Sequence, residues 1–501
     1  MGRSIVISQW TTVFLLGLAL GGLLMHLSSC TSFDKRLIHN HVKMLASDDF
    51  DGRAPMTAGE LKAVSYLEEN FRTYGLKPLP KFQGFRQSVP LARIHTDVTA
   101  PILFSNMILK PSEDIVVTSN ALQDSIKIKD VPVVFIGFGI NAPEYNWNDY
   151  QNINVKGKIV VMLVNDPGFY APNLFRGKDM TYYGRWTYKF EEAARQGALG
   201  AFVIHETDAA GYGFHVVSHK SSTLKINNTS DGLVLQGWLS LDATNNIFQS
   251  MHLNFDALKQ QAINKANTHA DLGILSLQAK NAIALGKSYN VCGYLEGHDT
   301  NHYTAISAHW DHLGSTDNTQ GKKDIYRGAI DNGTGVAAIL ELARYFSKNK
   351  PQNNLLVCSF TAEEQGLLGA QYFVDHPPVP LSSLKGMLNF DCLNVDSPNK
   401  NIVFYGPKTN SLYPVLVSVA KEADRGLLDD PNASKGYFYR SDHFPFIQNQ
   451  VPSLLFMDIG ISNPKYLTHH YHQPTDAHDP NWTLDGFVQD LELFKQLINR
   501  L

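Results

Sequence analysis

The sequence predicts an α/β sandwich, in which helices cover both faces of a largely parallel sheet, with a second, β-rich unit inserted into it. The chain has 501 residues, which is too long for one ordinary hydrophobic core. After Leu285, strand-like and helix-like segments alternate, as they do in α/β proteins. Before that point, about 150 residues have mainly strand character, which is the size of one further domain.

The composition narrows the functional class. Of the residues, 44% are hydrophobic and 18% are charged, which excludes a disordered chain and a multi-span membrane protein. The net charge of −4 gives no positive field for nucleic acid, so we expect no nucleic-acid partner. The 4 cysteines are too few for a disulfide framework. We expect Cys292, Cys358 and Cys392 to be buried thiols, because each lies in an apolar, strand-like segment.

Residues 1–29 have the features of a secretory signal. Arg3 precedes an apolar run that ends near Leu24 and is too short for a membrane span. The small residues before Cys30 resemble a bacterial lipobox, in which that cysteine is lipidated and becomes the mature N-terminus. An ordinary cleaved signal or a single anchor is the alternative. Because Thr31 replaces the Asp of the inner-membrane retention signal, we expect an extracytoplasmic protein on the outer membrane, facing the periplasm or cell surface and held only by a lipid at Cys30.

The part after the signal is expected to divide at two further points. Residues 30–126 would begin the main domain, residues 127–283 would form the insert, and residues 284–501 would complete the main domain. Apolar residues three or four positions apart predict that 35–78 is largely helical, with Gly75 at a helix end. The strands expected in the insert are 131–140, 158–163 and 201–205, with a helix over 191–196.

The last part of the chain carries the clearest alternation. Short apolar runs predict its strands, and longer periodic segments predict its helices. The expected strands are 304–308, 355–360, 387–390 and 453–457, and the expected helices are 334–346, 413–422 and 484–498.

Histidines and carboxylates gather where these strands end, which is where open α/β sheets place their sites. His309 follows an apolar strand, and Asp311 could accept a hydrogen bond from the ring of His309. Asp331 precedes an Ala- and Leu-rich helix, where a carboxylate can either favour the helix start or bridge two cations. Each motif alone is also typical of an ordinary loop or helix start.

Glu363 and Glu364 are the sharpest single signal. They follow the strand at 355–360, where two like charges are unexpected unless a metal neutralises one and a water or substrate proton engages the other. Asp391 ends the next expected strand. Three histidines lie between 469 and 472, and one of them is expected to bind metal.

These segments together supply two histidines and several carboxylates but no thiolate. Such a set suits zinc or another divalent transition metal in a catalytic site, since structural zinc favours cysteine. A bridging carboxylate with ligands on each side is the arrangement of two-metal hydrolases such as aminopeptidases and phosphatases. The sequence has no Gly-rich phosphate loop, no His-Glu-x-x-His helix and no Gly-x-Ser-x-Gly elbow.

The order of these segments resembles metallopeptidase family twenty-eight, the co-catalytic di-zinc aminopeptidases. The similarity extends across most of the chain and includes an entry segment at 45–53. Residues 131–283 resemble a protease-associated insert, notably at 142–147 and 191–198. The resemblance implies the zinc-peptidase fold, a three-layer sandwich around a mostly parallel mixed sheet, with an inserted protease-associated domain.

The resemblance also implies a ligand set for two zinc ions per chain. One zinc would be bound by His309 and Asp391. The second would be bound by Glu364 and His472, and Asp331 would bridge both ions.

Three further residues receive roles from the resemblance. Glu363 would be the general base that takes a proton from the attacking water, and Asp311 would orient His309. His443 lies in a segment similar to one near the substrate in the family, and it would stabilise the tetrahedral intermediate. Because every ligand position and the base are present, we expect an active enzyme.

The expected function is therefore an extracytoplasmic zinc aminopeptidase that acts on peptides with a free N-terminus. Glutaminyl cyclisation with a single zinc, carboxypeptidase activity and dipeptidase activity remain open on the same fold. The alternative from another class is a non-catalytic surface binding protein with the insert as its recognition module. The intact ligand set argues against that alternative.

Overall fold

The computed structural model describes residues 33–227, 232–264, 267–317 and 321–501. The signal segment 1–29 and Cys30 lie outside the described residues, so the lipobox remains a prediction. In the ranges that are described, no helix has the length and apolar character needed to cross a membrane.

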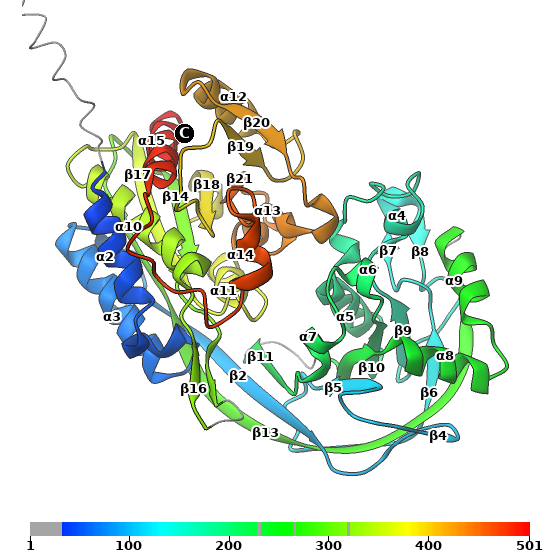
Figure 1. Cartoon of the computed structure of the whole chain (residues 1–501). Helices are drawn as coiled ribbons and strands as arrows, with labels where there is room; N and C mark the ends of the chain where they lie inside the picture. The colour runs from blue at the N-terminus through cyan, green and yellow to red at the C-terminus, as the bar shows by residue number, and fades with distance from the viewer. Residues whose placement is uncertain (1–32, 228–231, 265–266, 318–320) are drawn as a thin grey trace, which may run out of the picture.

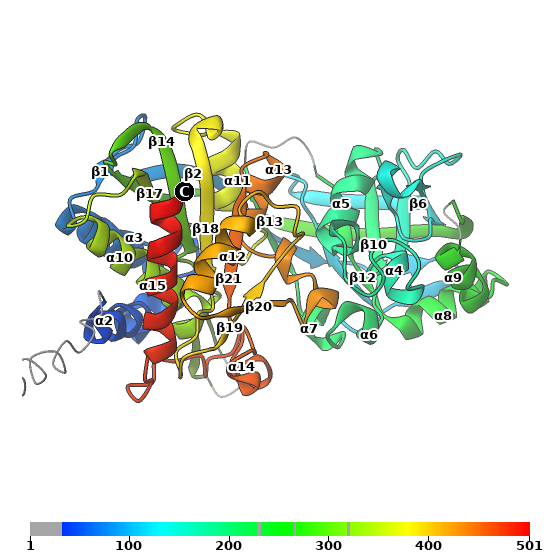
Figure 2. The same cartoon turned by 90° about the horizontal axis from the view of Figure 1, so that it is seen from above.

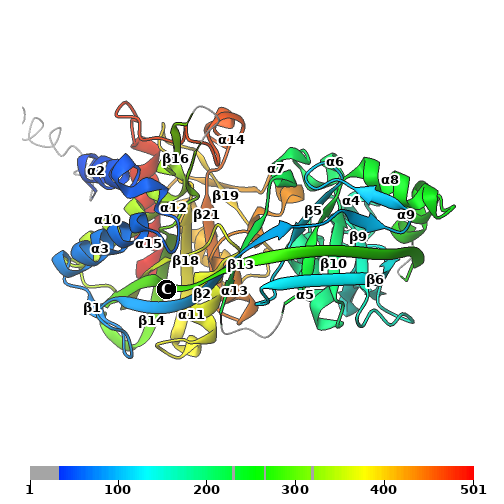
Figure 3. The ribbon, with the colours of Figure 1, turned by 90° about the horizontal axis from the view of Figure 1, so that it is seen from below.

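Two lobes are joined by a long ribbon of strands (Figure 1). β13 (Ala270–Leu295) runs from one lobe into the other, and β2 (Arg86–Val98) pairs with it antiparallel over the middle of its length. Figure 3 shows β13 and β2 side by side beneath both lobes. We refer to residues 33–98 and 280–501 as the main lobe, and to residues 99–279 as the inserted lobe.

The sheet of the main lobe is mostly parallel, as predicted. Its strand order is β21-β18-β14-β17-β13, and only β13 in this row runs antiparallel to its neighbour. The parallel strands are β14 (Asp299–His309), β17 (Asn353–Phe360), β18 (Leu384–Asp391) and β21 (Ser453–Met457).

Helices cover both faces of this sheet, because successive residues of its strands point to opposite sides. In β17, for example, Leu355 and Val357 belong to one core, whereas Leu356 and Cys358 belong to the other. Figure 2 shows α15 lying along the first of these faces. The first face is covered by α2 (Lys35–Leu45), α3 (Ala58–Thr73), α10 (Gly335–Phe346), α12 (Tyr413–Glu422) and α15 (Asp485–Arg500), and the second by α11 (Leu368–Asp375) and α13 (His443–Gln448).

The predicted elements of the last part of the chain are confirmed to within a few residues. The segments at 413–422 and 453–457 coincide with α12 and β21. Cys292, Cys358 and Cys392 are buried free thiols, as expected. Smaller elements complete the main lobe: β1 (Lys77–Pro78), β15 (Gly314–Asp317), β16 (Lys323–Tyr326), β19 (Asn401–Phe404), β20 (Gly426–Asp429) and α14 (Pro464–His469).

The inserted lobe has its own cores, and its limits differ from the expected ones. The boundaries expected at 126/127 and 283/284 fall inside β6 (Ser125–Phe135) and β13. Apolar residues from Ile102 to Ala279 pack in a core of the inserted lobe, so the strands before residue 126 belong to it as well. Those earlier strands are β3 (Ile102–Phe104), β4 (Met107–Leu109) and β5 (Ile115–Thr118).

The inserted lobe also contains more helix than its β-rich pattern suggested. Its strands β6, β9, β10 and β12 are parallel, and β5 pairs antiparallel at the edge. The further elements are β7 (Asn141–Ala142), β8 (Trp147–Asn148), β9 (Ile159–Leu163), β10 (Gly200–Ile204), β11 (Ser222–Ile226), β12 (Leu235–Leu239), α4 (Pro167–Tyr170), α5 (Trp186–Arg195), α6 (Thr207–Ala210), α7 (His215–Ser218), α8 (Leu241–Ser250) and α9 (Phe255–Asn264).

The lobes touch a second time, away from the ribbon. The backbone N–H of Met180 donates to the carbonyl oxygen of Ala433 at 3.1 Å. The Tyr182 ring lies 5.0 Å from that of Phe444 and 6.0 Å from that of Tyr439. The inserted lobe is thus fixed to the main lobe both by the ribbon and by this aromatic contact.

Candidate metal centre

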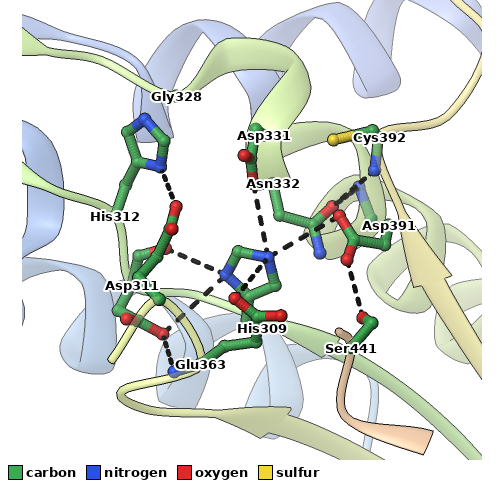
Figure 4. A network of polar contacts seen from close by, with 12 residues as sticks. His309, Asp311, His312, Gly328, Asp331, Asn332, Glu363, Asp391, Cys392 and Ser441 are labelled. Atoms are coloured by element: carbon green, nitrogen blue, oxygen red, sulfur yellow. Dashed lines mark hydrogen bonds and ion pairs between the residues drawn. The ribbon is translucent and has the colours of Figure 1, made fainter. Parts of the chain in front are cut away.

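The predicted site residues meet at the edge of the main sheet where its parallel strands end (Figure 4). His309 is the last residue of β14, and Asp391 is the last residue of β18. Glu363 and Glu364 lie in the loop after β17, and Asp331 lies in the turn η4 (Ala329–Thr334) that leads into α10. Parallel strands bring their carboxyl ends to the same edge, so residues far apart in sequence converge there.

One group of side chains surrounds the ring of His309. Its Nε2 atom lies 3.4 Å from Asp331 Oδ1, 3.7 Å from Asp391 Oδ1 and 3.9 Å from Glu363 Oε2. The hydroxyl of Ser441 donates to Asp391 Oδ2 at 2.6 Å and so fixes the orientation of that carboxylate.

A second group forms on the other side of Asp331. The Nε2 atom of His472 lies 3.1 Å from Asp331 Oδ2 and 3.2 Å from Glu364 Oε2. Asp331 therefore presents one oxygen to His309 and the other to His472, which is the placement that a bridging carboxylate requires. Of the histidines between 469 and 472, His472 is the one that contacts these carboxylates.

His312 belongs to the site, although the sequence analysis gave it no role. Its Nδ1 atom lies 2.6 Å from Glu364 Oε1, and His312, Asp331 and Glu364 could together hold a metal ion. The signal was present in the sequence, because His312 follows His309 by three residues at the same strand end.

Asp311 supports the site in a different way from the one expected. The Nδ1 atom of His309 lies 3.0 Å from the backbone carbonyl oxygen of Asp311 and 3.8 Å from its carboxylate Oδ1. That carboxylate oxygen instead accepts a hydrogen bond from the backbone N–H of Glu363 at 3.1 Å. Asp311 thus links the loop after β14 to the loop that carries the two glutamates.

His443 lies at the start of α13 and is fully buried. Neither ring nitrogen has a hydrogen-bond partner among the described residues. Burial lowers the pKa of His443 to about 3, so the imidazole is neutral at pH 7. The structure shows no contact between this ring and the cluster around His309, and its role in stabilising an intermediate remains a prediction.

The cluster concentrates negative charge in a buried position. Burial favours the neutral form of Asp331, but hydrogen bonds from His309 and His472 outweigh it and hold the pKa of Asp331 well below its usual range. Burial, with the charges of Asp391 and Glu364, raises the pKa of Glu363 well above its usual range, although His309 opposes the shift. The cluster therefore contains both ionised carboxylates and one that readily holds a proton.

The imidazoles respond to the same charges. Burial favours neutral rings, but the carboxylate of Glu363 and the hydrogen bond with Asp331 raise the pKa of His309 well above its usual range. For His472, the charge of Glu364 likewise overcomes burial and raises the pKa to about 10. Protons on these rings neutralise the carboxylates in the way that divalent cations would.

The donor chemistry fits zinc. Within the described ranges, the carboxylates of Asp331, Glu363, Glu364 and Asp391 form ion pairs with histidines and with no lysine or arginine. Buried carboxylates need a compensating cation, and a set of imidazole nitrogens and carboxylate oxygens is typical of catalytic zinc sites. The residues present could thus bind two divalent ions, one on each side of Asp331.

Arg53 holds the loops of the site from behind. Its guanidinium donates to the carbonyl oxygens of Trp310 at 2.8 Å, Arg327 at 2.6 Å and Gly328 at 3.0 Å, and also to that of Leu45 at 2.6 Å. Burial lowers the pKa of Arg53 to about 10, so it remains charged at neutral pH. This cation connects the loop after His309 with the loop before Asp331.

A glycine next to this arginine allows the close approach. Gly52 has a φ of +65°, and a Cβ atom there would lie 2.1 Å from the carbonyl oxygen of Gly314. Only a residue without a side chain fits this position.

Asp476 gives a second support from the C-terminal side. Its carboxylate accepts hydrogen bonds from the backbone N–H groups of Ile330 and Asp331, both at 3.0 Å. The hydroxyl of Tyr466 donates to the same carboxylate at 3.1 Å. Asp476 therefore fixes the backbone of the turn that presents the central carboxylate of the site.

We predict that Arg53→Met lowers the free energy of unfolding by about 3–5 kcal/mol, because four carbonyl oxygens lose a buried, charged donor. Zinc affinity should fall with it, since the loops that carry the ligands lose their common anchor. Lys62→Met is the control, because Lys62 is 46% exposed and its pair with Asp49 contributes at most about 1 kcal/mol. Equal losses in the two variants, measured by chemical denaturation, would contradict the assignment.

We also predict that zinc binding to the metal-free protein at pH 7 releases protons. His309 and His472 hold protons there because their pKa values are raised, and a ligating imidazole must be neutral. An indicator dye in weak buffer measures the release, which should diminish as the pH approaches about 10, the pKa of His472. His472→Asn should release fewer protons, and the exposed His376→Asn should behave as the wild type. Binding without proton release at pH 7 would contradict the prediction.

Comparisons with known proteins show which family part of this chain resembles. Residues 290–493 match Peptidase family M28. A probable leucine aminopeptidase 2 of Aspergillus oryzae is 29% identical over 173 residues, which are 33% of this chain and 32% of that protein. Leupeptin-inactivating enzyme 1 of Streptomyces exfoliatus is 30% identical over 167 residues, which are 33% of this chain and 34% of that enzyme. The chain spans about a third of the length of these curated relatives.

A similarity in structure covers both lobes. The aminopeptidase from Aneurinibacillus sp. strain AM-1 has the same fold over 93% of this chain and 92% of its own, with a TM-score of 0.50 at 18% identity. The family match begins in β13 and includes every predicted ligand, from His309 to His472. The region that is similar to Peptidase family M28 is thus the one that contains the candidate metal centre.

Proposed function

We propose that the protein is a zinc-dependent aminopeptidase that removes N-terminal residues from peptides. The observation that carries the proposal is the position of Asp331 between His309 and His472, with Glu363 beside the same cluster. The names of the leucine aminopeptidase of Aspergillus oryzae and of the aminopeptidase from Aneurinibacillus support this activity.

The ligand set divides into two halves around Asp331. His309 and Asp391 would bind one zinc, and Glu364 and His472 would bind the second, with one oxygen of Asp331 on each. Bound zinc would supply a water molecule of lowered pKa and polarise the scissile carbonyl group. These residues alone determine where that chemistry takes place.

His312 would act through Glu364. Its Nδ1 atom is 2.6 Å from Glu364 Oε1, whereas His472 approaches the other oxygen of that carboxylate. A partner on one oxygen orients the other toward a metal, as hydrogen-bonded neighbours of metal ligands commonly do.

Glu363 is the proposed general base. Its Oε2 atom lies 3.9 Å from Nε2 of the proposed ligand His309, so its carboxylate is placed to accept a proton from the attacking water and to release it to the leaving amine. The hydrogen bond from its backbone N–H to Asp311 fixes the base in the loop after β17. Asp311 is thus a positioning residue in this proposal.

We predict that Glu363→Gln lowers kcat for leucine p-nitroanilide about 1000-fold while zinc content is unchanged, because a general base contributes about 10²- to 10⁴-fold. Glu296→Gln, at an exposed pair with Lys77, is the matched control and should keep full activity. A chelator should abolish wild-type hydrolysis, and added zinc should restore it.

Metal analysis of the same preparations tests the number of zinc ions bound per chain. Two zinc ions per chain are expected, whereas a single tightly bound zinc would favour a glutaminyl cyclase. Near wild-type turnover by Glu363→Gln would show that the base is assigned wrongly. A chain that binds no zinc at neutral pH would favour a surface binding protein.

We further propose that the protein is extracytoplasmic, anchored by a lipid at Cys30, and that the inserted lobe acts as a protease-associated domain over the site. The apolar run up to Leu24 and the small residues before Cys30 support the location. In cells, Cys30→Ser should abolish incorporation of labelled fatty acid and move the protein from the membrane fraction to the soluble fraction. Unchanged labelling in this variant would contradict the anchor.

A further inference from the structure

Three cationic side chains lie where the two lobes face each other beside the metal centre. Arg185 and Lys220 belong to the inserted lobe, and Arg440 belongs to the main lobe. Figures 1 and 3 show α7, which precedes Lys220, on the side of the inserted lobe that faces the main lobe.

Two of these cations follow short turns that pack against each other. Arg185 comes directly after η3 (Tyr182–Gly184), and Arg440 comes directly after η7 (Tyr437–Tyr439). The rings of Tyr182 and Tyr439 lie 6.0 Å apart, so the contact between the lobes brings the two turns together. The same contact therefore places Arg185 and Arg440 near each other.

Arg440 connects this contact to the metal centre. Its Nη2 atom donates to the hydroxyl of Tyr471 at 3.4 Å. The Tyr471 ring stacks on the ring of His472, with 3.9 Å between centroids and 23° between planes. The guanidinium is thus separated from a proposed zinc ligand by one aromatic side chain.

Lys220 approaches from the inserted lobe. Its Nζ atom lies 5.8 Å from the ring of Trp186, the residue after Arg185, and 5.8 Å from the ring of Trp238. These aromatic faces stabilise the charge of Lys220 without neutralising it.

These cations lack the acidic partners that other cations of the inserted lobe have. Arg195 pairs with Glu192 at 2.8 Å, and Lys259 pairs with Glu206 at 2.7 Å. In the part of the chain that the structure describes, Arg185, Lys220 and Arg440 form no ion pair with a carboxylate. The partners of Arg440 are instead the hydroxyl of Tyr471 and the ring of Tyr437. Three like charges close together are unfavourable unless an anion joins them.

The electrostatic environment of these cations also favours an anion beside them. Burial, and then the charge of Arg440, lower the pKa of Arg185 to about 10, and the same two effects lower the pKa of Lys220. The carboxylates that act on Lys220 and Arg440 are Glu364 and Glu363, which belong to the metal centre. Bound zinc would neutralise those carboxylates and leave the three cations without a counter-charge.

We propose that Arg185, Lys220 and Arg440 form a carboxylate-binding subsite that selects peptides with a carboxylate close to the scissile bond. This inference rests on the proposed aminopeptidase function. The carboxylate could be the C-terminus of a short peptide or the side chain of an acidic residue on either side of the bond. Guanidinium groups bind carboxylates through paired hydrogen bonds, so two arginines and a lysine suit this ligand.

The test compares kcat/KM for three pairs of substrates that differ only in the charge of one group. Leu-Gly against Leu-Gly-amide tests the C-terminus, and Leu-Asp-amide against Leu-Asn-amide tests the residue after the bond. Glutamyl against glutaminyl p-nitroanilide tests the N-terminal residue. At least one pair should show a preference of about tenfold or more for the carboxylate, since hydrogen bonds to charged groups correspond to about that ratio.

Variants then assign the preference to the subsite. Arg185→Gln and Lys220→Gln should each reduce the ratio about tenfold, and Arg185→Lys should restore part of it if the fold is intact. Lys156→Gln is the matched control: it is an exposed lysine beyond the far end of α5, about 15 Å from Arg185 by helix length, and should leave the ratio unchanged. The preference should also weaken with added salt.

The outcomes separate this inference from the proposed function. Hydrolysis of leucine p-nitroanilide, which has no carboxylate, reports the aminopeptidase activity alone, and it should persist in Arg185→Gln and Lys220→Gln. Hydrolysis without a carboxylate preference in any pair would overturn the subsite but not the function. A preference that survives both glutamine variants would also overturn it, whereas absence of all hydrolysis would overturn the function itself.

Discussion

The need to hold several carboxylates together in a buried place is the constraint on which the rest of the main lobe depends. Asp331, Glu363, Glu364 and Asp391 come from three separate segments, and their mutual repulsion opposes the fold that joins them. Two imidazoles compensate this charge from within the cluster, and the buried Arg53 compensates it from behind. The loops are therefore organised around a charge that the protein alone balances with protonated imidazoles and one buried guanidinium.

The supports of the cluster act on backbone more than on side chains. Arg53 binds four carbonyl oxygens, and Asp476 binds two N–H groups of the turn before α10. Asp311 similarly accepts from the backbone of Glu363. Such contacts fix the backbone path of each loop. The positions of the ligand side chains then follow largely from the backbone.

Much of this arrangement could be predicted from the sequence, because strand ends in an α/β sheet are places where apolar runs give way to polar residues. His309, Asp391 and the two glutamates are recognisable for that reason. The role of His312 was missed although it follows His309 by three residues, since its partner Glu364 lies in the loop after another strand. The sequence analysis likewise noted Arg53 only as part of the entry segment 45–53 and gave it no role. Its carbonyl partners are spread over nearly 300 residues of chain, so no local pattern reveals them.

The inserted lobe was harder to delimit for a physical reason. A boundary is visible in a sequence when it falls in a polar linker, but here the inserted lobe begins directly after β2 and ends within the continuous strand β13. Buried and exposed residues of β13 still alternate from Ala279 to Ala282, so this pattern does not mark the point where the strand leaves the inserted lobe. Helices such as α8 and α9 also contribute apolar residues to the core of the inserted lobe, and the sequence pattern does not distinguish these residues from those of strands.

The pairing of β2 with β13 also describes how a two-lobed molecule can be related to a one-lobed one. Val98 and Ala279 are direct partners in the antiparallel register, and the whole inserted lobe lies between them in sequence. In topology the lobe is an enlarged hairpin loop at the tip of a ribbon that the main lobe already contains. A two-residue turn at this position would close the same ribbon, because antiparallel partners need no longer connection. The lobe is thus an addition that the central sheet can gain or lose without a change in the order of its strands.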